Sequence, residues 1–450
     1  MSPTEPPCAS GYANRLLADL GAPLRVSRGV EPHPALRWAQ CGAMALTGYP
    51  QQTPQMCPVP LASYADGILA ALNALRPHSP VRHLDGAQLL GERAALAGYR
   101  RGGDIAPGGS CRLLPLEDGW LAVNLARTSD WQMLPAWLEA GVIADWAQLG
   151  AALRSRRVED CLERGRLMGL ALAPLRRRAP AQVPWCRELY RSSAPRRERG
   201  TAPPLVVDLS ALWAGPLCAH LLQMMGAQVI KVESSARPDG MRQAAAGFYD
   251  LLNAGKASVA LDFDQPRARA QLRRLLLRAD IVIEASRPRA LRQLGIVAEQ
   301  ILAENPTATW VGISGYGREE PGANWVAFGD DAAVAGGLSQ VLWDCTGRVM
   351  FCADALADPF TGLHAALAAW GSFQQGGGRL LSLTLCDVVA HAIGCAALAD
   401  PAASRARARQ WSDRVGPEDV AAPQARPLRA PARPLGADTT QILAGLGGRA

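Results

Sequence analysis

The stretch PLVVDLSALWAGPLCAHLLQMMGAQVIKVE, residues 204–233, predicts a β-α-β unit. Residues 205–209 form an apolar run typical of a buried strand, and apolar side chains recur at helical spacing in the segment that follows. Pro216 falls early in that helix, where its missing N–H costs little, and Gly226 is a favoured C-cap before a second strand at 228–233. Such a unit implies parallel strands joined by a right-handed crossover. We therefore predict an α/β fold with a parallel sheet.

Five further blocks follow in the C-terminal half of the chain, among them LLNAGKASVALDF and ADPFTGLHAALAAW. They occupy residues 251–263, 279–295, 305–317, 357–370 and 433–447. Together with residues 204–233 they resemble the class III coenzyme A transferases, the family of formyl-CoA and carnitine CoA-transferases and of α-methylacyl-CoA racemase. The resemblance covers about half of the chain, with the blocks in family order.

This resemblance implies a Rossmann-like parallel sheet in a large domain, a smaller α+β domain and a C-terminal segment threaded across a neighbour. It also implies an enzyme that takes acyl-CoA and a carboxylic acid as substrates, with no permanently bound cofactor and no metal. The acyl group is not encoded in any motif that we can interpret.

The family's catalytic carboxylate lies in an Asp-x-x-Thr/Ser-Gly motif before an apolar helix, and DPFTG at 358–362 matches it. By this resemblance Asp358 attacks the thioester carbonyl and forms a mixed anhydride, then an aspartyl-CoA thioester. We expect the helix N-terminus to stabilise its anion, and Gly362 to permit close approach of the acyl-CoA. The alternative is that Asp358 is a plain N-cap, and Asp354, which lacks the Thr-Gly sequel, is the competing nucleophile.

The resemblance also implies residues that bind CoA. A loop at 211–215 would line the pantetheine path, two cations would suit the phosphates, and a turn at a strand end lies where ligands of open α/β sheets bind. The predicted contacts are Trp213, Ala214, Gly215, Arg242, Lys256, Ser286, Arg287 and Gly362. The alternative for the two cations, Arg242 and Lys256, is a solvated surface charge.

Several positions depart from the family pattern. Ala285 stands where the family has Asn, and further departures occur at Gln293 and Gly329. Asp330 occupies the place of the racemase's histidine base, which disfavours racemisation because that reaction needs two opposed acid/base groups. A racemase or isomerase of the same fold and a non-catalytic CoA-binding subunit remain the alternatives to a transferase.

The first part of the chain looks like a degenerate echo of the second. PLASYADGILAALNAL at 60–75 aligns without gaps with residues 355–370, which places Ser63 at the position of Asp358 and Gly67 at that of Gly362. We expect a homodimer or a fused pseudo-dimer with one active site per chain. The predicted domains are a partial large-domain copy (1–100), a small α+β domain (101–175), a basic linker (176–203), a complete large domain (204–400) and an extended tether with a terminal helix (401–450).

Composition is ordinary for a soluble globular protein, with 49% apolar and 19% charged residues. The net charge of +7 comes largely from two basic segments, 176–199 and 405–433, in which aromatic residues do not alternate with the basic ones, and this disfavours nucleic-acid binding. No apolar run is long enough to span a membrane, and the first residues do not resemble a secretory signal. Eleven scattered cysteines favour reduced thiols, so we expect a cytoplasmic protein.

Overall fold

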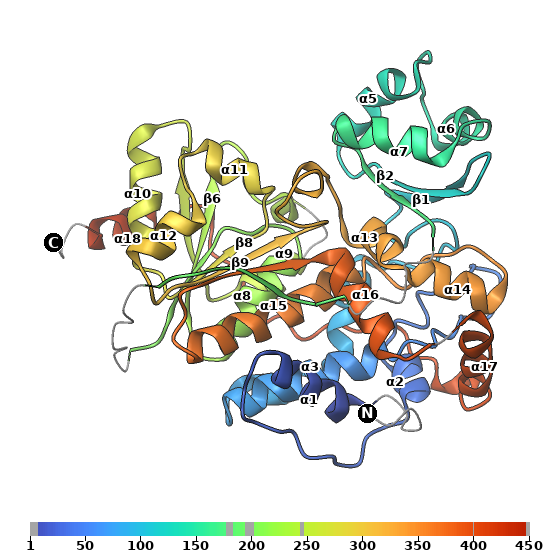
Figure 1. Cartoon of the computed structure of the whole chain (residues 1–450), viewed down its shortest axis with the longest axis horizontal. Coiled ribbons are helices and arrows are strands. Elements are labelled where there is room, and N and C mark those ends of the chain that lie inside the picture. Colours follow the sequence, from blue (N-terminus) through green and yellow to red (C-terminus); the bar gives the residue numbers. More distant parts are fainter. Residues whose placement is uncertain (1–7, 177–182, 194–201, 244–246, 399, 447–450) are drawn as a thin grey trace.

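A computed structural model describes residues 8–176, 183–193, 202–243, 247–398 and 400–446 of the chain. Its centre is a seven-stranded sheet with the strand order β4-β10-β9-β8-β5-β6-β7 (Figure 1). Six strands are parallel, and β4 at one edge is antiparallel to β10. The strands are β4 (Arg187–Arg191), β5 (Leu205–Asp208), β6 (Gln228–Ser234), β7 (Ala257–Leu261), β8 (Ile281–Glu284), β9 (Thr309–Ser314) and β10 (Arg379–Thr384).

The predicted β-α-β unit is confirmed. Helix α8 (Ala214–Met224) joins β5 to β6, and these strands pair in parallel from Leu205 opposite Gln228. Gly226 ends the connection at φ 94°, a left-handed conformation that favours glycine. The fold class predicted from the sequence, α/β with a large parallel sheet, is therefore correct.

Both faces of the sheet are covered by helices, because alternate residues of each strand point to opposite faces. Val206 of β5 belongs to the core shared with α8 and α15 (Ala357–Gln374). Val207 belongs to the core beneath α10 (Pro266–Leu276) and α12 (Ala298–Glu304). The other helices of this part are α9 (Phe248–Asn253), α11 (Pro288–Gln293), α13 (Gly329–Gly336), α14 (Leu338–Thr346), α16 (Leu385–Cys395), α17 (Pro401–Ser412) and α18 (Thr439–Gly445).

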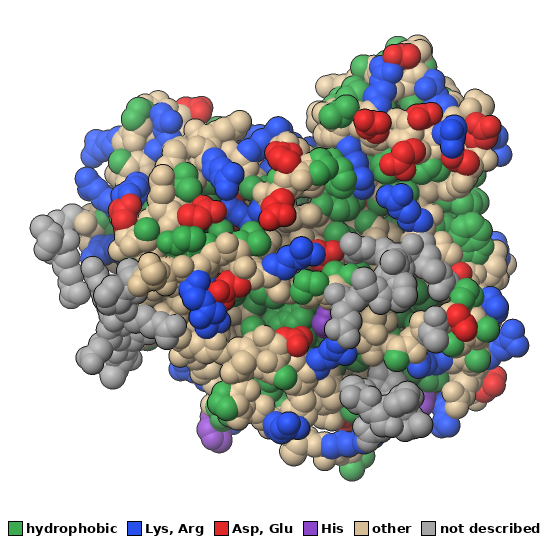
Figure 2. Space-filling view, in the orientation of Figure 1, with side chains coloured by type: hydrophobic (Ala, Val, Ile, Leu, Met, Phe, Trp, Pro, Cys, Tyr) green, Lys and Arg blue, Asp and Glu red, His purple; other side chains and the backbone are tan. Residues whose placement is uncertain are grey.

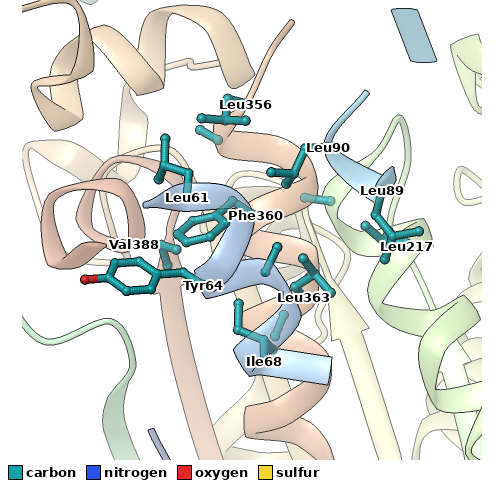
Figure 3. Close-up of a cluster of buried hydrophobic side chains, with 14 of the residues drawn as sticks. Leu61, Tyr64, Ile68, Leu89, Leu90, Leu217, Leu356, Phe360, Leu363 and Val388 are labelled. Carbon is teal, nitrogen blue, oxygen red and sulfur yellow. The ribbon is translucent and has the colours of Figure 1, made fainter. Parts of the chain in front are cut away.

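The N-terminal residues pack onto α15 as helices. They form α1 (Ala9–Asp19), α2 (Pro34–Gln40), α3 (Leu61–Leu75) and α4 (Glu92–Ala97), and the described residues up to 100 contain no strand. Figure 3 shows side chains of α3, α8 and α15 pointing toward one another. Leu61, Ile68, Leu217 and Phe360 are all fully buried there. The N-terminal helices and the large sheet thus share one core.

The helix pair α1–α3 repeats the pair α8–α15. Helices α1 and α8 each have 11 residues, and each ends at a left-handed glycine. A Cβ built on Gly67 would lie 2.4 Å from the Ala9 carbonyl oxygen, and a Cβ built on Gly362 would lie 2.6 Å from the Ala214 carbonyl oxygen. Glycine is required at both crossings because backbone occupies the place of a side chain. This equivalence supports the duplication predicted from the sequence, although the first copy carries only its helices.

A small separate layer projects beside the large sheet (Figure 1). Its antiparallel sheet consists of β1 (Cys111–Pro115), β2 (Trp120–Asn124) and β3 (Ala171–Pro174), and it is covered by α5 (Thr128–Leu138), α6 (Trp146–Leu153) and α7 (Val158–Leu167). Alternating apolar residues around Asp118 and Gly119 predict two strands joined by a turn, and the pairing of β1 with β2 confirms them. Figure 2 shows acidic and basic side chains interspersed on this part, and a notch in the outline separates it from the larger lobe.

Three sequence expectations about connecting segments are wrong. The segment 176–203, predicted as a linker, supplies edge strand β4, although parts of it lie outside the described residues. The tether predicted from 401 begins with helix α17, because Asp400 caps Ala403 and Pro401 suits the first turn. The apolar pattern at 142–154 predicts a helix from 142, but the helix begins at Trp146, where Asp145 caps it. In the part of the chain that the structure describes, no helix has the length and apolar character to cross a membrane.

The glycine at the α1–α3 crossing makes a testable prediction. Gly67→Ala should lower the free energy of unfolding by about 1–3 kcal/mol, because its Cβ collides with the Ala9 carbonyl. Gly150→Ala is the matched control, since Gly150 lies within α6 and its nearest neighbour is 3.9 Å away. That control should be neutral or stabilising. Denaturant unfolding measures the stability of both variants. A Gly67→Ala variant as stable as the Gly150→Ala control would contradict the close contact between Gly67 and the Ala9 carbonyl.

Candidate active site

Asp358 lies in the first turn of α15, where three buried segments meet. The backbone N–H of Gly329, at the start of α13, donates to its carboxylate. Asp330 on the same turn of α13 accepts a hydrogen bond of 2.8 Å from the Ala355 N–H. Asp354 lies in the loop that leads into α15 and is completely buried. The negative charges of Asp330 and Asp354 both act on Asp358, so the site is a cluster of three carboxyl groups.

The loop before α15 is held in a strained conformation. Ala353 and Ala355, on either side of Asp354, have φ values of 54° and 42°. A left-handed conformation costs a residue with a Cβ roughly 1–2 kcal/mol. The Oγ1 of Thr47 accepts from the Ala353 N–H at 3.0 Å, and Asp330 holds the Ala355 N–H. A residue of the N-terminal part thus helps to fix the loop that carries the carboxylates.

Arg93 of α4 provides the positive charge at this cluster. Its Nε donates to Asp354 Oδ2 at 2.8 Å, and its Nη2 donates to Asp354 Oδ1 at 2.6 Å. The guanidinium also lies 5.3 Å from the centroid of the Trp213 ring and 5.7 Å from that of Tyr99. Sequence reasoning missed Arg93, because it belongs to the degenerate first copy and to none of the family-like blocks.

Burial raises the pKa of Asp358 to about 7, and the positive charge of Arg93 only partly opposes this shift. Burial, together with the negative charge of Asp354, raises the pKa of Asp330 to about 6. A backbone N–H at a helix N-terminus does lower this pKa, but it is that of Gly329 on α13, and desolvation outweighs it. Burial also raises the pKa of Asp331 to about 7, even though Asn124 of the small domain donates to it at 2.8 Å.

The predicted CoA loop lies next to this cluster. Trp213 is buried against Arg93 and Phe248, at the N-terminus of α8. Lys231 donates to the Ser210 carbonyl at 2.8 Å, and Asp239 accepts from the Leu212 N–H at 3.1 Å, which fixes the loop before the helix. The first two N–H groups of α8 have no acceptor among the described residues. They belong to Ala214 and Gly215, two of the residues for which the resemblance implies CoA binding.

Helix α1, which corresponds to α8 in length and in its glycine crossing, shows what such a helix end can hold. At α1, the carboxylate of Glu31 accepts from the Ala9 N–H at 2.7 Å and from the Ser10 N–H at 2.9 Å. Aligning α1 with α8 matches these two residues to Ala214 and Gly215. At α1 the Glu31 side chain therefore occupies the helix end. At α8 no described residue accepts a hydrogen bond from the corresponding N–H groups.

Two predicted phosphate ligands have structural partners instead. The Lys256 ammonium is buried and donates to Asp208, to the Pro216 carbonyl and to Asn253 at 2.9–3.0 Å. Three acceptors use all three of its N–H groups. Arg242 forms a two-pronged ion pair with Glu233 and donates to the Arg433 carbonyl of the C-terminal segment. The structure thus gives both cations a role in folding in place of the predicted phosphate contacts.

Of the other predicted contacts, Gly362 serves helix packing, Ser286 bonds to a neighbouring side chain, and Arg287 belongs to a basic patch of four arginines. Gly362 faces the Ala214 carbonyl, so close helix packing explains this glycine without the substrate. Ser286 donates to Glu284 at 3.3 Å. Arg287 begins α11 beside Arg289, Arg127 and Arg237, and partial burial together with these charges lowers its pKa. In the described part of the chain, only Arg127 of these four has an acidic partner, Asp130.

A family model described as CoA-transferase family III matches residues 204–430. The succinate–glutarate CoA-transferase of Agrobacterium fabrum is 30% identical over 207 residues, which cover 41% of this chain and 52% of that protein. The formyl-CoA:oxalate CoA-transferase of Escherichia coli is 28% identical over 197 residues, 41% of this chain and 47% of that protein. The chain thus spans about half the length of the curated relatives that it matches.

A crystal structure of a CaiB/BaiF family protein from Brucella suis matches 42% of this chain and 53% of that one, at 29% identity and a TM-score of 0.39. At that score the likeness adds nothing to the fold already described. The family model, in contrast, covers half of the chain and includes β5 to β10, α8, α15 and the three carboxylates of the site. On this match, the protein belongs to CoA-transferase family III.

Proposed function

We propose that this protein is a CoA-transferase that moves CoA from an acyl-CoA donor to a carboxylic acid, with Asp358 as the covalent nucleophile. The observation that carries the proposal is the environment of Asp358. It is a partly exposed carboxyl group in the family's motif, with its pKa raised to about 7 and a guanidinium close by. A carboxylate that is poorly solvated and not fully neutralised by a partner is a stronger nucleophile than one in water.

The proposed reaction conserves the energy of the thioester and requires no net proton transfer. The Asp358 carboxylate attacks the thioester carbonyl, which releases CoA thiolate and leaves an acyl-aspartyl anhydride. The thiolate attacks the aspartyl carbonyl, which releases the donor carboxylate and forms an aspartyl-CoA thioester. The acceptor carboxylate then attacks this thioester, and the freed thiolate attacks the acceptor's carbonyl in the new anhydride. The products are the acceptor's acyl-CoA and free Asp358.

The basic patch and the α8 loop suggest how CoA lies. Arg237, Arg287 and Arg289 offer charge for its diphosphate at the carboxyl ends of β6 and β8. From there a pantetheine arm can follow the loop at 211–215, since a Cβ on Gly215 would lie 3.5 Å from Ala285 at the end of β8. Trp213 and Arg93 connect this loop to the carboxylates. The open N–H groups of Ala214 and Gly215 would donate hydrogen bonds to an oxygen of the substrate.

The duplication bears on assembly. Ser63 replaces the nucleophile in the first copy, and Glu31 occupies its helix end, so we propose one active site per chain. The α1–α3 pair packs on α15 in the manner of a second copy, which favours a fused pseudo-dimer over a homodimer. All eleven cysteines are free thiols, in keeping with a proposed cytoplasmic location.

A second candidate is racemisation of an acyl-CoA. The observation that favours it is the proximity of Asp330 and Asp358, two carboxyl groups with raised pKa values that could exchange protons with an α-carbon. Incubation of an α-branched acyl-CoA in D₂O without an acceptor separates the two functions. A racemase incorporates deuterium at the α-carbon, whereas a transferase leaves that position unlabelled and requires a second carboxylic acid.

The nucleophile can be tested against the interpretation that Asp358 is only an N-cap. Asp358→Asn should lower the transfer rate about a thousandfold or more, because an amide does not form the anhydride. Asp145→Asn is the matched control, because Asn caps a helix as well as Asp does and Asp145 caps α6 in the small domain. The control should transfer CoA normally. A steady-state assay with a panel of acyl-CoAs and acids compares them, and full activity of Asp358→Asn would rule out the proposed mechanism.

The pKa of Asp358 predicts a pH dependence. Its ionised form is the nucleophile, so kcat/KM should rise with pH through about 7. Arg93→Gln removes a positive charge that lowers this pKa, so the rise should move to higher pH. Asp330→Asn removes a negative charge that raises it, so the rise should move to lower pH. The readout is the pH at which kcat/KM rises in each variant. Shifts of both variants in the same direction would contradict the opposite charge effects assigned to Arg93 and Asp330.

A further inference from the structure

A large cavity lies away from the carboxylates. Its volume is about 920 Å³, within the range of small-molecule sites. It is bounded by the end of α8 near Gly226, by the loop after α3, by the end of α9 and by the segment 426–430. The carboxylates lie at the other end of α8, which is about 16 Å long for its 11 residues. Three parts of the chain that are distant in sequence therefore meet around one space.

The cavity carries an excess of positive charge. Arg76, Arg426 and Arg429 line it, and Asp250 is its only acidic residue. Arg426 is neutralised by Glu92, with Nε donating at 2.6 Å and Nη2 at 3.0 Å. Neither of the other two arginines forms an ion pair with any described residue. Two positive charges thus face the cavity uncompensated.

Arg76 is positioned rather than free in solvent. It lies 5.3 Å from the centroid of the Trp370 ring. Its Nη2 lies 2.8 Å from the point that a Cβ on Gly226 would occupy, so the guanidinium rests against the turn into β6. The apolar side chains of Met224, Met225 and Leu251 form the neighbouring wall. The cavity therefore combines a cationic end with an apolar surface.

His220 adds a hydrogen-bond donor without an acceptor. Arg426 Nη1 donates to His220 Nε2 at 3.1 Å, because a guanidinium can only donate. In the neutral imidazole the proton then lies on Nδ1, which is buried and has no partner among the described residues. Burial and the nearby arginines hold the pKa of His220 well below its usual range, so the ring is neutral. An anion in the cavity would counter this positive field.

We infer that this cavity binds a phosphate monoester carried on an apolar or aromatic body. Such a group has a charge of roughly −1.5 to −2 at neutral pH and so matches the two uncompensated arginines, Arg76 and Arg429. Arginine forks suit phosphate oxygens, and the wall formed by Met224, Met225 and Leu251 suits the rest of the ligand. Because Arg429 lies in the C-terminal segment, the ligand ties that segment to α3 and α8.

This site is separate from the proposed CoA contacts. Those contacts lie at the carboxyl ends of the strands, whereas Gly226 precedes the first residue of β6. CoA itself carries one phosphate monoester, on its ribose, so the ligand is either that group or a separate phosphorylated molecule. Both share the chemistry that the cavity recognises, and the test below distinguishes them.

The probe is phenyl phosphate, titrated calorimetrically into the full chain. We expect one saturable site, with affinity at least tenfold lower in the Arg76→Gln/Arg429→Gln double variant. Arg267→Gln, which removes an exposed charge on α10, is the matched control and should bind as the original protein does. NMR titration of His220, assigned with a His220→Gln variant, should show a higher pKa when phenyl phosphate is bound.

Competition identifies the source of the phosphate. Displacement of the probe by CoA but not by dephospho-CoA assigns the site to the CoA ribose phosphate, and displacement by neither assigns it to a separate molecule. Absence of saturable binding to the original protein would overturn the inference. Equal binding by the double variant would also overturn it, provided that its thermal unfolding matches that of Arg267→Gln. Because the experiment measures binding and not transfer activity, its outcome is independent of whether the proposed function is correct.

Discussion

The ion pair between Arg93 and Asp354 is the interaction on which the site depends. A completely buried carboxylate costs several kcal/mol unless a cation compensates it, and loss of one partner of such a pair costs on the order of 3–5 kcal/mol. Arg93 comes from α4, far from Asp354 in the sequence. The loop before α15 can therefore hold its carboxylates only when the N-terminal helices are docked. The same ion pair therefore both supplies positive charge at the site and requires the N-terminal helices to pack against the large domain.

The correspondence between the two helix pairs is consistent with how the N-terminal helices fit there. The pairs α1–α3 and α8–α15 cross at equivalent glycines, and α3 packs on α15 within one core (Figure 3). The two helix pairs share this geometry but differ in the residues at the helix end and at the nucleophile position. The first places Glu31 at its helix end and Ser63 at the nucleophile position, whereas the second keeps an open helix end and a carboxylate. The first copy contributes Arg93 and Thr47, so it supports the site without forming a second one.

The elements that alternate strictly between strand and helix were predictable from the sequence. The apolar runs at 281–284 and 309–314 predict strands, and both match the structure to the residue, because buried parallel strands are short apolar runs bounded by turn residues. Strand β4 was not predictable, since Arg187–Arg191 is polar and pairs only at the sheet edge. Lys256 was misassigned because a motif shows a cation but not its partners, and burial beside Asp208 depends on tertiary packing. Arg93 gave no signal for the same reason.

The most direct test of this account is to trap the intermediate and find the residue that carries it. The purified protein is incubated with an acyl-CoA, treated with hydroxylamine or borohydride, digested and mapped by mass spectrometry. The account predicts a modification on the peptide that contains Asp358. Turnover of acyl-CoA with an unmodified Asp358, or with the modification on Asp354 or Asp330, would contradict it.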